Sequence, residues 1–251
     1  MVGIDTNKVS IDTFKRQLKI HKGLSDTTIE TYISCYRKFG IFIGKRVVTL
    51  RLIEDYLLKS KNRRNNLAML KALYPDLVKN FKFPRRRIAP KFLPLKEDMN
   101  RFYIELPDKY KVIFLALASS GLRISELLNA EIDRKNHMFI PQQHNGQTKQ
   151  SWLSFYNDET AALLKDSFEI KHSDSVNHYF KKVARKIGID ITPHTLRSIF
   201  AREMSRKGVQ DRYIDCYCGR TPQSVLARHY SDYSPEVLKE IYEKAGIKIL
   251  S

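Results

Sequence analysis

The sequence predicts a mainly α-helical protein with a small antiparallel β-sheet, arranged as an all-helical N-terminal domain followed by a mixed α/β domain. Apolar residues recur at helical spacing along most of the 251 residues. Two short β-like runs flank Asn145-Gly146, a pair typical of hairpin turns. Pro84 and Pro90 interrupt the helical pattern inside a basic stretch. We therefore expect domains at residues 1–83 and 92–251, joined by a basic linker at residues 84–91.

Four amphipathic helices are expected in residues 1–83. Ser10, Ser25 and Thr49 each stand where a helix N-cap is needed. The spacing of three and four residues between apolar side chains is typical of a core-facing helix surface. These apolar stripes are Ile11, Phe14 and Leu18; Ile29, Tyr32, Ile33, Tyr36 and Phe39; Leu52, Ile53, Tyr56 and Leu57; and Leu67, Leu70 and Leu73.

The C-terminal domain is expected to combine buried helices with the hairpin. Residues 112–118 are continuously apolar and indicate a buried helix that breaks at Gly121. Residues 138–141 and 151–155 are the expected strands. Apolar residues then indicate a helix from 176 to 187 and another opened by Pro193. A final helix is expected after Ser234, with an apolar stripe formed by Val237, Leu238, Ile241, Tyr242 and Ala245.

The charge distribution favours a polyanionic partner. The chain has 45 Lys and Arg residues against 27 Asp and Glu, a net charge of +18, and residues 1–90 hold 20 of the basic but only 7 of the acidic residues. Nucleic acid is the simplest partner for such an excess. The alternative for the linker is a solvated connector that contacts nothing. The candidate DNA-binding residues of the helical domain and linker are Arg63, Arg64, Arg85, Arg86 and Arg87.

Several other classes of protein are not expected. The longest apolar run has seven residues, whereas a membrane span needs roughly 18, and no signal peptide is recognised. Three cysteines fit a reducing, cytoplasmic compartment. Residues 40–46 miss the spacing of a phosphate-binding loop, and the Cys216–Cys218 pair lacks further zinc ligands. We therefore expect no cofactor and no metal.

Three segments of the C-terminal domain carry basic residues in a pattern suited to phosphodiester chemistry. Arg123 lies in Gly-Leu-Arg-Ile-Ser-Glu-Leu, residues 121–127, and His194 and Arg197 share a helix face at i, i+3. Arg220 follows a glycine and precedes Tyr230 by ten positions. Guanidinium groups stay protonated and grip two phosphate oxygens at once. A phenol, with a pKa near 10, needs such help to act as a nucleophile.

These segments, in this order, resemble the signature of the tyrosine recombinase family, which includes phage integrases and Xer-type recombinases. The resemblance covers residues 92–235 closely, and the helical domain loosely as the family's core-binding domain. An arginine at position 220, where bacterial relatives have His or Trp, looks most like archaeal virus and plasmid integrases. The resemblance implies the tyrosine recombinase catalytic fold for the second domain.

The resemblance also implies an activity: a site-specific DNA recombinase that cuts and rejoins strands through a 3′-phosphotyrosyl intermediate and a Holliday junction, without metal or ATP. Its partners would be double-stranded DNA attachment sites, with a homotetramer on synapsed DNA and a monomer or dimer when free. The implied roles are phosphate binding by Arg123, Arg197 and Arg220, general acid catalysis by Lys149, general base catalysis by His194 and nucleophilic attack by Tyr230.

Alternatives stay open for single residues. Arg123 can instead pair with Glu126 across one helical turn, and Lys149 can be a solvated turn residue. Tyr233 is a second candidate nucleophile. His194 can be structural, with His229 as a weaker candidate base. The final helix either packs on its own domain or, as family resemblance implies, docks on a neighbouring subunit.

Three alternatives stay open for the whole protein. It could be an Xer-like resolvase of chromosome or plasmid dimers, a type IB topoisomerase-like enzyme, or a DNA-binding factor without catalysis. All three would share the basic surface, so the charge does not separate them.

Overall fold

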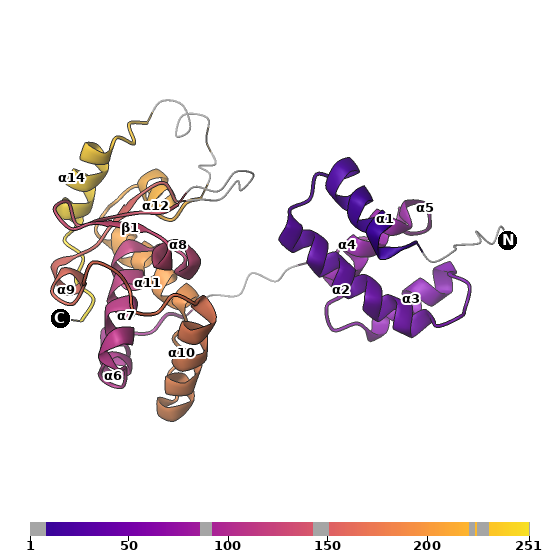
Figure 1. The fold of residues 1–251 in the computed structure, drawn as a ribbon, viewed down its shortest axis with the longest axis horizontal. Helices are drawn as coiled ribbons and strands as arrows, with labels where there is room; N and C mark the ends of the chain where they lie inside the picture. Colours follow the sequence, from indigo (N-terminus) through magenta and orange to yellow (C-terminus); the bar gives the residue numbers. More distant parts are fainter. Residues whose placement is uncertain (1–8, 86–91, 143–150, 221–223, 225–230, 251) are drawn as a thin grey trace. The chain divides into compact units, whose positions relative to one another are not determined.

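The computed structural model describes residues 9–85, 92–142, 151–220, 224 and 231–250. The chain divides into two compact units, Met1–Pro90 and Lys91–Ser251 (Figure 1). No helix within the described ranges is long and apolar enough to cross a membrane. Of the expected linker, residues 84 and 85 are irregular and the rest lies outside the described residues.

The first unit is entirely helical in its described part, as expected. Ser10 Oγ accepts from the backbone N–H of Thr13 at 3.2 Å, and Thr49 Oγ1 accepts from that of Leu52 at the same distance. Ser25 precedes its helix, but its hydroxyl meets the hydroxyl of Thr28 rather than the backbone. The elements are α1 (Ile11–Arg16), the π-helix η1 (Gln17–His21), α2 (Asp26–Ile43), α3 (Leu50–Lys59), α4 (Arg63–Leu73) and α5 (Pro75–Val78).

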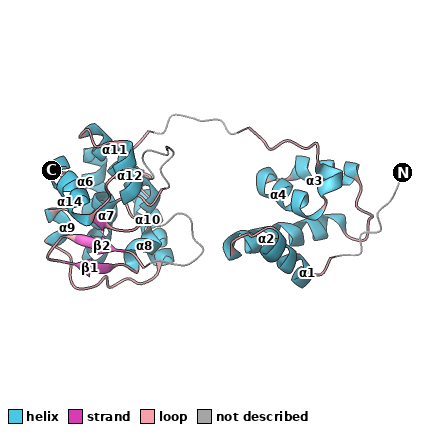
Figure 2. Ribbon diagram, turned by 90° about the horizontal axis from the view of Figure 1, so that it is seen from above, coloured by secondary structure: helices cyan, strands magenta, loops and turns pink. Residues whose placement is uncertain are grey.

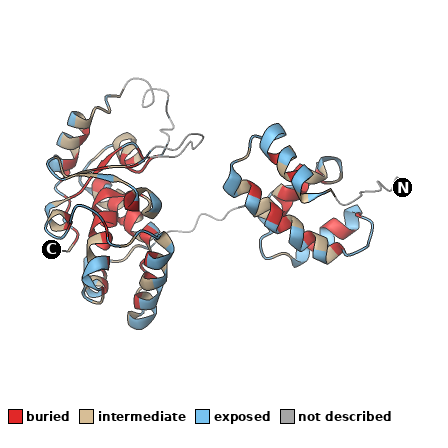
Figure 3. Ribbon diagram, viewed as in Figure 1, coloured by how far each residue is buried: buried red, intermediate tan, exposed pale blue. Residues whose placement is uncertain are grey.

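The predicted apolar stripes form the core of this unit. Phe14, Ile33 and Phe39 are fully buried, and the other buried positions face the same interior (Figure 3). Among the described residues of this unit, Asn66 is the buried polar side chain. Asn66 accepts from Tyr56 Oη at 3.0 Å and donates to Ser60 Oγ at 2.7 Å, so its buried amide is hydrogen-bonded.

The second unit combines helices with a small three-stranded antiparallel sheet, which Figure 2 shows at one edge of the unit. The predicted fold class, mainly α with a small antiparallel sheet, is confirmed. The helices are α6 (Lys96–Ile104), α7 (Asp108–Ser120), α8 (Ile124–Leu128), α9 (Asp158–Ala161), α10 (Ser173–Ile187), α11 (Pro193–Arg206), α12 (Asp211–Tyr217) and α14 (Pro235–Ala245). The strands are β1 (Glu131–Asp133), β2 (Met138–Ile140) and β3 (Ser154–Phe155).

The sheet differs from the prediction in two ways. β2 and β3 pair with Phe139 opposite Ser154, but β3 begins three residues later than expected. The backbone N–H of Ser151 donates to the carboxylate of Glu126 and not to a neighbouring strand. β1 was missed because three residues with little alternation give no recognisable strand pattern. The expected turn at residues 145–146 lies outside the described residues.

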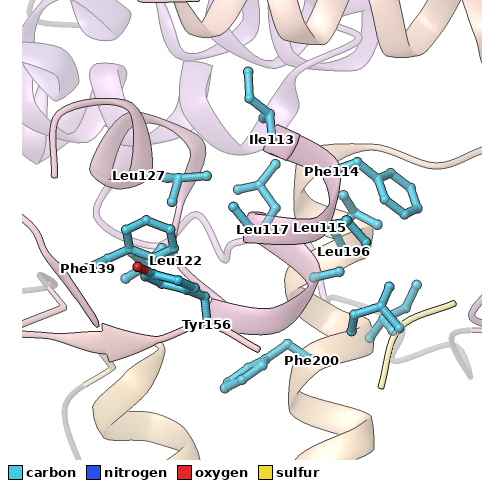
Figure 4. Close-up of a cluster of buried hydrophobic side chains, with 14 of the residues drawn as sticks. Ile113, Phe114, Leu115, Leu117, Leu122, Leu127, Phe139, Tyr156, Leu196 and Phe200 are labelled. Carbon is cyan, nitrogen blue, oxygen red and sulfur yellow. The ribbon is translucent and has the colours of Figure 1, made fainter. Parts of the chain in front are cut away.

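Helix α7 is the centre of the second unit. Its residues from Ile113 to Ser120 are all buried, and its principal partner is α11 (Figure 4). The helix ends at Gly121, which has a left-handed φ of 67°. A Cβ at this position would collide with the ring of Phe200 on α11. Gly121 therefore permits both the reversal of the chain and the close approach of the two helices.

Helix α14 packs against its own unit, which is the first of the two expectations for it. Leu238, Tyr242 and Ala245 are buried, and Tyr242 Oη donates to the carbonyl of Ser119 at 2.9 Å. The tail that follows is held by Glu159, whose carboxylate accepts from the backbone N–H groups of Ile249 and Leu250 at 2.6 and 3.0 Å. Three residues of the apolar stripe are thus buried within the unit, whereas Val237 and Ile241 stay partly exposed.

Candidate active site

Arg197 is a buried guanidinium held by two backbone carbonyls. It lies on α11 and is only 4% exposed. Its Nη1 donates to the carbonyl of Gly121 at 2.6 Å, and its Nη2 donates to the carbonyl of Cys218. Burial lowers the pKa of Arg197 from its ordinary value, with smaller effects of the same sign from the charges of Arg123 and Arg220. An arginine starts so far above neutrality that the group stays protonated.

Arg123 precedes α8 and is bound to Glu126. Its backbone N–H donates to Glu126 Oε2 at 2.8 Å and its Nη1 donates to Oε1 at 2.7 Å. Its Nη2 lies 3.5 Å from the carbonyl of Gly219. The expected pairing across one turn therefore exists. About a third of the side chain (34%) remains exposed.

Glu126 joins three segments of the chain. Besides Arg123, it accepts from the backbone N–H and the hydroxyl of Ser151, both at 3.3 Å. Its Oε2 also lies 3.9 Å from Arg197 Nη1. The carboxylate thus partly neutralises two arginines and fixes their spacing. Glu126 was identifiable from the sequence, but Ser151 was not, because a serine in a predicted strand carries no signal of such a contact.

The turn after α12 brings in the third arginine. The carbonyls of Cys218 and Gly219 accept from Arg197 and Arg123 respectively, so two consecutive peptide groups hold both side chains. The next residue, Arg220, forms an ion pair with Asp215 at 3.3 Å, and its side chain is 46% exposed. The described residues therefore bring the arginines of all three sequence segments to one place.

Comparison with known proteins identifies the family. A sequence model described as the phage integrase family matches residues 95–236. The chain belongs to the phage integrase family. It is 26% identical to the tyrosine recombinase XerA of Pyrococcus horikoshii, over 96% of this chain and 95% of that protein. The sequence-based identification as a tyrosine-type recombinase is thereby confirmed.

Solved structures of integrases share the fold of this family member. A lambda integrase dimer bound to a COC′ core site gives a TM-score of 0.67 at 15% identity, covering 88% of this chain and 76% of that one. A lambda integrase tetramer bound to a Holliday junction gives 0.66 at 14% identity, covering 89% and 78%. At this level of identity the comparison establishes the fold alone.

Some predicted residues of this integrase-family chain cannot be placed. Lys149, His229 and Tyr230, and the linker arginines Arg86 and Arg87, lie outside the described residues. Their roles therefore stay predictions. Within the part of the second unit that is described, no group of three or more His, Cys, Asp or Glu side chains is arranged to hold a metal ion.

His194 and Arg197 differ sharply in environment although they share one helix. His194 lies in the first turn of α11 and is exposed, whereas Arg197 is buried. The backbone carbonyl of His194 accepts from the hydroxyl of Ser198 at 3.0 Å.

Tyr233, the alternative nucleophile, is half-buried in the recombinase core. Its ring packs edge-on against that of Tyr213, with centroids 5.9 Å apart. Tyr230 lies outside the described residues, so its assignment as the nucleophile stays a prediction.

The candidate DNA contacts of the helical unit are partly described. Arg63 and Arg64 lie exposed in the first turn of α4, and Arg85 is exposed beyond it. The guanidinium of Arg64 lies 5.2 Å from the centroid of the Phe83 ring. This contact restricts the side chain while leaving its charge at the surface.

Proposed function

We propose that this protein is a site-specific DNA recombinase that cuts and rejoins DNA strands through a covalent 3′-phosphotyrosyl intermediate. The observation that carries the proposal is the convergence of Arg123, Arg197 and Arg220 from three distant sequence segments. Like charges brought together in a protein need a compensating anion. Glu126 and Asp215 supply part of it, and a scissile phosphate would supply the rest.

The arginine cluster suits a phosphoryl-transfer transition state. Negative charge grows on the non-bridging oxygens as the phosphorus becomes five-coordinate, and preorganised guanidinium groups stabilise that charge. Arg197 is fixed by two carbonyls, so it does not reorganise during the reaction. Arg123 and Arg220 are partly exposed and can contact the DNA directly.

The remaining steps use residues assigned from the sequence. The phenolic oxygen of Tyr230 attacks the phosphorus, its proton passing to His194, and the bond from phosphorus to the 5′ oxygen breaks. Lys149 donates a proton to that leaving oxygen. Rejoining reverses these steps with a 5′ hydroxyl of the partner strand, so the phosphodiester bond is conserved and no energy source is needed.

Assembly on DNA follows from the same proposal. Each subunit cuts one strand, so exchange between two duplex sites requires four subunits and passes through a Holliday junction. The lambda integrase tetramer, whose fold this chain shares, is itself bound to such a junction. The basic helical unit would hold the duplex while the second unit carries out the chemistry.

The proposal is tested by trapping the covalent intermediate. The protein is incubated with fragmented DNA, denatured, and any DNA that stays attached is sequenced. A nicked substrate built on the recovered site then measures cleavage by wild type, Tyr230→Phe and Tyr233→Phe. We expect an adduct with wild type and Tyr233→Phe but none with Tyr230→Phe. If wild type forms no adduct, the result would indicate a DNA-binding factor without catalysis.

Two further outcomes separate related activities. Relaxation of supercoiled DNA that lacks the recovered site, with no exchange between sites, would indicate a type IB topoisomerase-like enzyme. The similarity to XerA over almost the whole chain favours an Xer-like resolvase as the second candidate. Efficient excision between two direct repeats of the site, with poor integration between separate molecules, would support that role.

A further inference from the structure

Tyr217 ends helix α12 directly before the turn that holds two arginines. The carbonyl of the next residue, Cys218, accepts from Arg197 Nη2. The carbonyl of Gly219, one residue later, lies 3.5 Å from Arg123 Nη2. Both residues of the turn are buried. The position of the end of α12 therefore helps to decide where the two guanidinium groups lie.

The ring of Tyr217 packs against three other elements of the second unit. It is fully buried and lies edge-on to rings on α11, β3 and α14, with centroid distances of 6.1, 6.3 and 6.2 Å to Phe200, Phe155 and Tyr242. Phe200 in turn lies so close to Gly121 that a Cβ there would collide with its ring. Gly121 offers the second carbonyl that binds Arg197. One aromatic cluster therefore lies behind both carbonyls that hold this arginine.

The hydroxyl of Tyr217 makes a contact that packing alone does not require. It donates to the carbonyl of Leu238 on α14 at 2.6 Å. A phenylalanine would fill the same space, so the hydroxyl contributes direction rather than volume. Burial raises the pKa of the phenol, so it stays protonated and remains a donor. The hydrogen bond thus fixes the end of α12 against α14.

We propose that Tyr217 is a positioning residue for the arginine cluster, an inference that rests on the proposed function. Its hydroxyl, anchored on Leu238, holds the turn whose carbonyls orient Arg197 and Arg123. Hydrogen bonds weaken as their geometry departs from linear. A displacement of about 1 Å in a group that stabilises a transition state can lower the rate about 10²-fold. A small shift of the end of α12 is therefore enough to slow cleavage.

The test is a double-mutant cycle between Tyr217→Phe and Arg197→Lys. Single-turnover adduct formation on the nicked substrate gives a rate constant for the folded molecules, whereas partial unfolding lowers the amplitude. We expect Tyr217→Phe to lower the rate constant about tenfold when Arg197 is present. When Arg197 is already lysine, the same change should lower it less than about twofold, because a residue that acts through the arginine then has little left to orient.

Tyr156→Phe is the matched control. Tyr156 is also a buried tyrosine of the second unit, and its hydroxyl donates to a backbone carbonyl, that of Asp133 on β1, at 3.4 Å. Asp133 is not part of the arginine cluster. The control should change the rate constant less than about twofold in either background, since contacting residues couple and separate ones do not.

The outcomes separate a failure of the inference from a failure of the proposed function. The inference on Tyr217 is overturned if Tyr217→Phe leaves the rate constant unchanged, if its loss is the same in both backgrounds, or if Tyr156→Phe loses as much. None of these results affects the proposed function. A wild type that forms no adduct, or an Arg197→Lys variant as fast as wild type, would overturn the proposed chemistry and the inference with it.

Discussion

Arg197 Nη1 donates to the carbonyl oxygen of Gly121 at 2.6 Å, joining residues 76 positions apart. The bond ties the turn after α7 to the middle of α11. The same turn starts the segment that presents Arg123. A glycine required by helix packing therefore also offers the carbonyl that holds one arginine of the candidate active site and precedes a second, Arg123, by two positions.

Replacing Gly121 by alanine tests this arrangement. The left-handed φ of 67° and the collision with Phe200 both penalise a Cβ. Together they should cost about 2–5 kcal/mol in the free energy of unfolding of the second unit. Gly188→Ala is the control, because Gly188 has a φ of 72° but open space around it, and it should cost about 1–2 kcal/mol. Urea unfolding of both variants measures the difference, and equal losses would contradict a packing role for Gly121.

Replacing Arg197 by lysine tests the double carbonyl contact. Lysine keeps the charge but lacks the planar fork that binds the carbonyls of Gly121 and Cys218 together. We expect adduct formation to fall about 10²–10³-fold. Arg202→Lys is the matched control on the same helix, since Arg202 binds the carbonyl of Pro94 outside the cluster. It should change the rate less than about twofold, and a similar loss in both variants would show a general effect on α11.

The helices that the sequence predicts have local signals. The stripes of α2 and α10 repeat over about three turns, and the caps at Ser10 and Thr49 lie next to the helices that they begin. Helices α5, α6, α9 and α12 were not predicted. β1 had no such signal, since three residues become a strand only through pairing with β2. The contact of Ser151 with Glu126 also has no local signal, since the two residues are 25 positions apart in the sequence.

The residue types of the candidate site were predictable from the sequence, but the hydrogen bonds that hold them were not. Arg123, Arg197 and Arg220 could be named from short motifs. The carbonyls of Cys218 and Gly219 could not, because any residue offers a carbonyl and only the fold decides which one faces a guanidinium. Which surface covers α14 was open for the same reason. An apolar stripe predicts that one face of a helix is covered, but tertiary structure decides what covers it.

Removing residues 237–251 tests how far the second unit depends on this tail. The deletion takes away buried apolar side chains of α14 and the segment after it, and exposes their partners. We expect a loss on the order of 5 kcal/mol or more, enough to unfold the second unit. Tyr242→Phe removes only the hydrogen bond to Ser119 and should cost about 1 kcal/mol. A truncated protein that unfolds at the wild-type urea concentration would contradict packing of the tail on its own unit.

The basic face of α4 gives a prediction about DNA affinity. Arg63 and Arg64 are exposed at the start of the helix, and Arg64 is restrained by the ring of Phe83. If each neutralises one phosphate, replacing both by alanine lowers the slope of log affinity against log salt concentration by about two. Lys165→Ala is the control, because Lys165 is exposed on the second unit and pairs with Glu169, and its slope should equal that of wild type. Affinity is measured by fluorescence anisotropy between low and physiological salt. A double variant whose slope is unchanged while its affinity falls would show that these arginines stabilise the helical unit and do not contact phosphate.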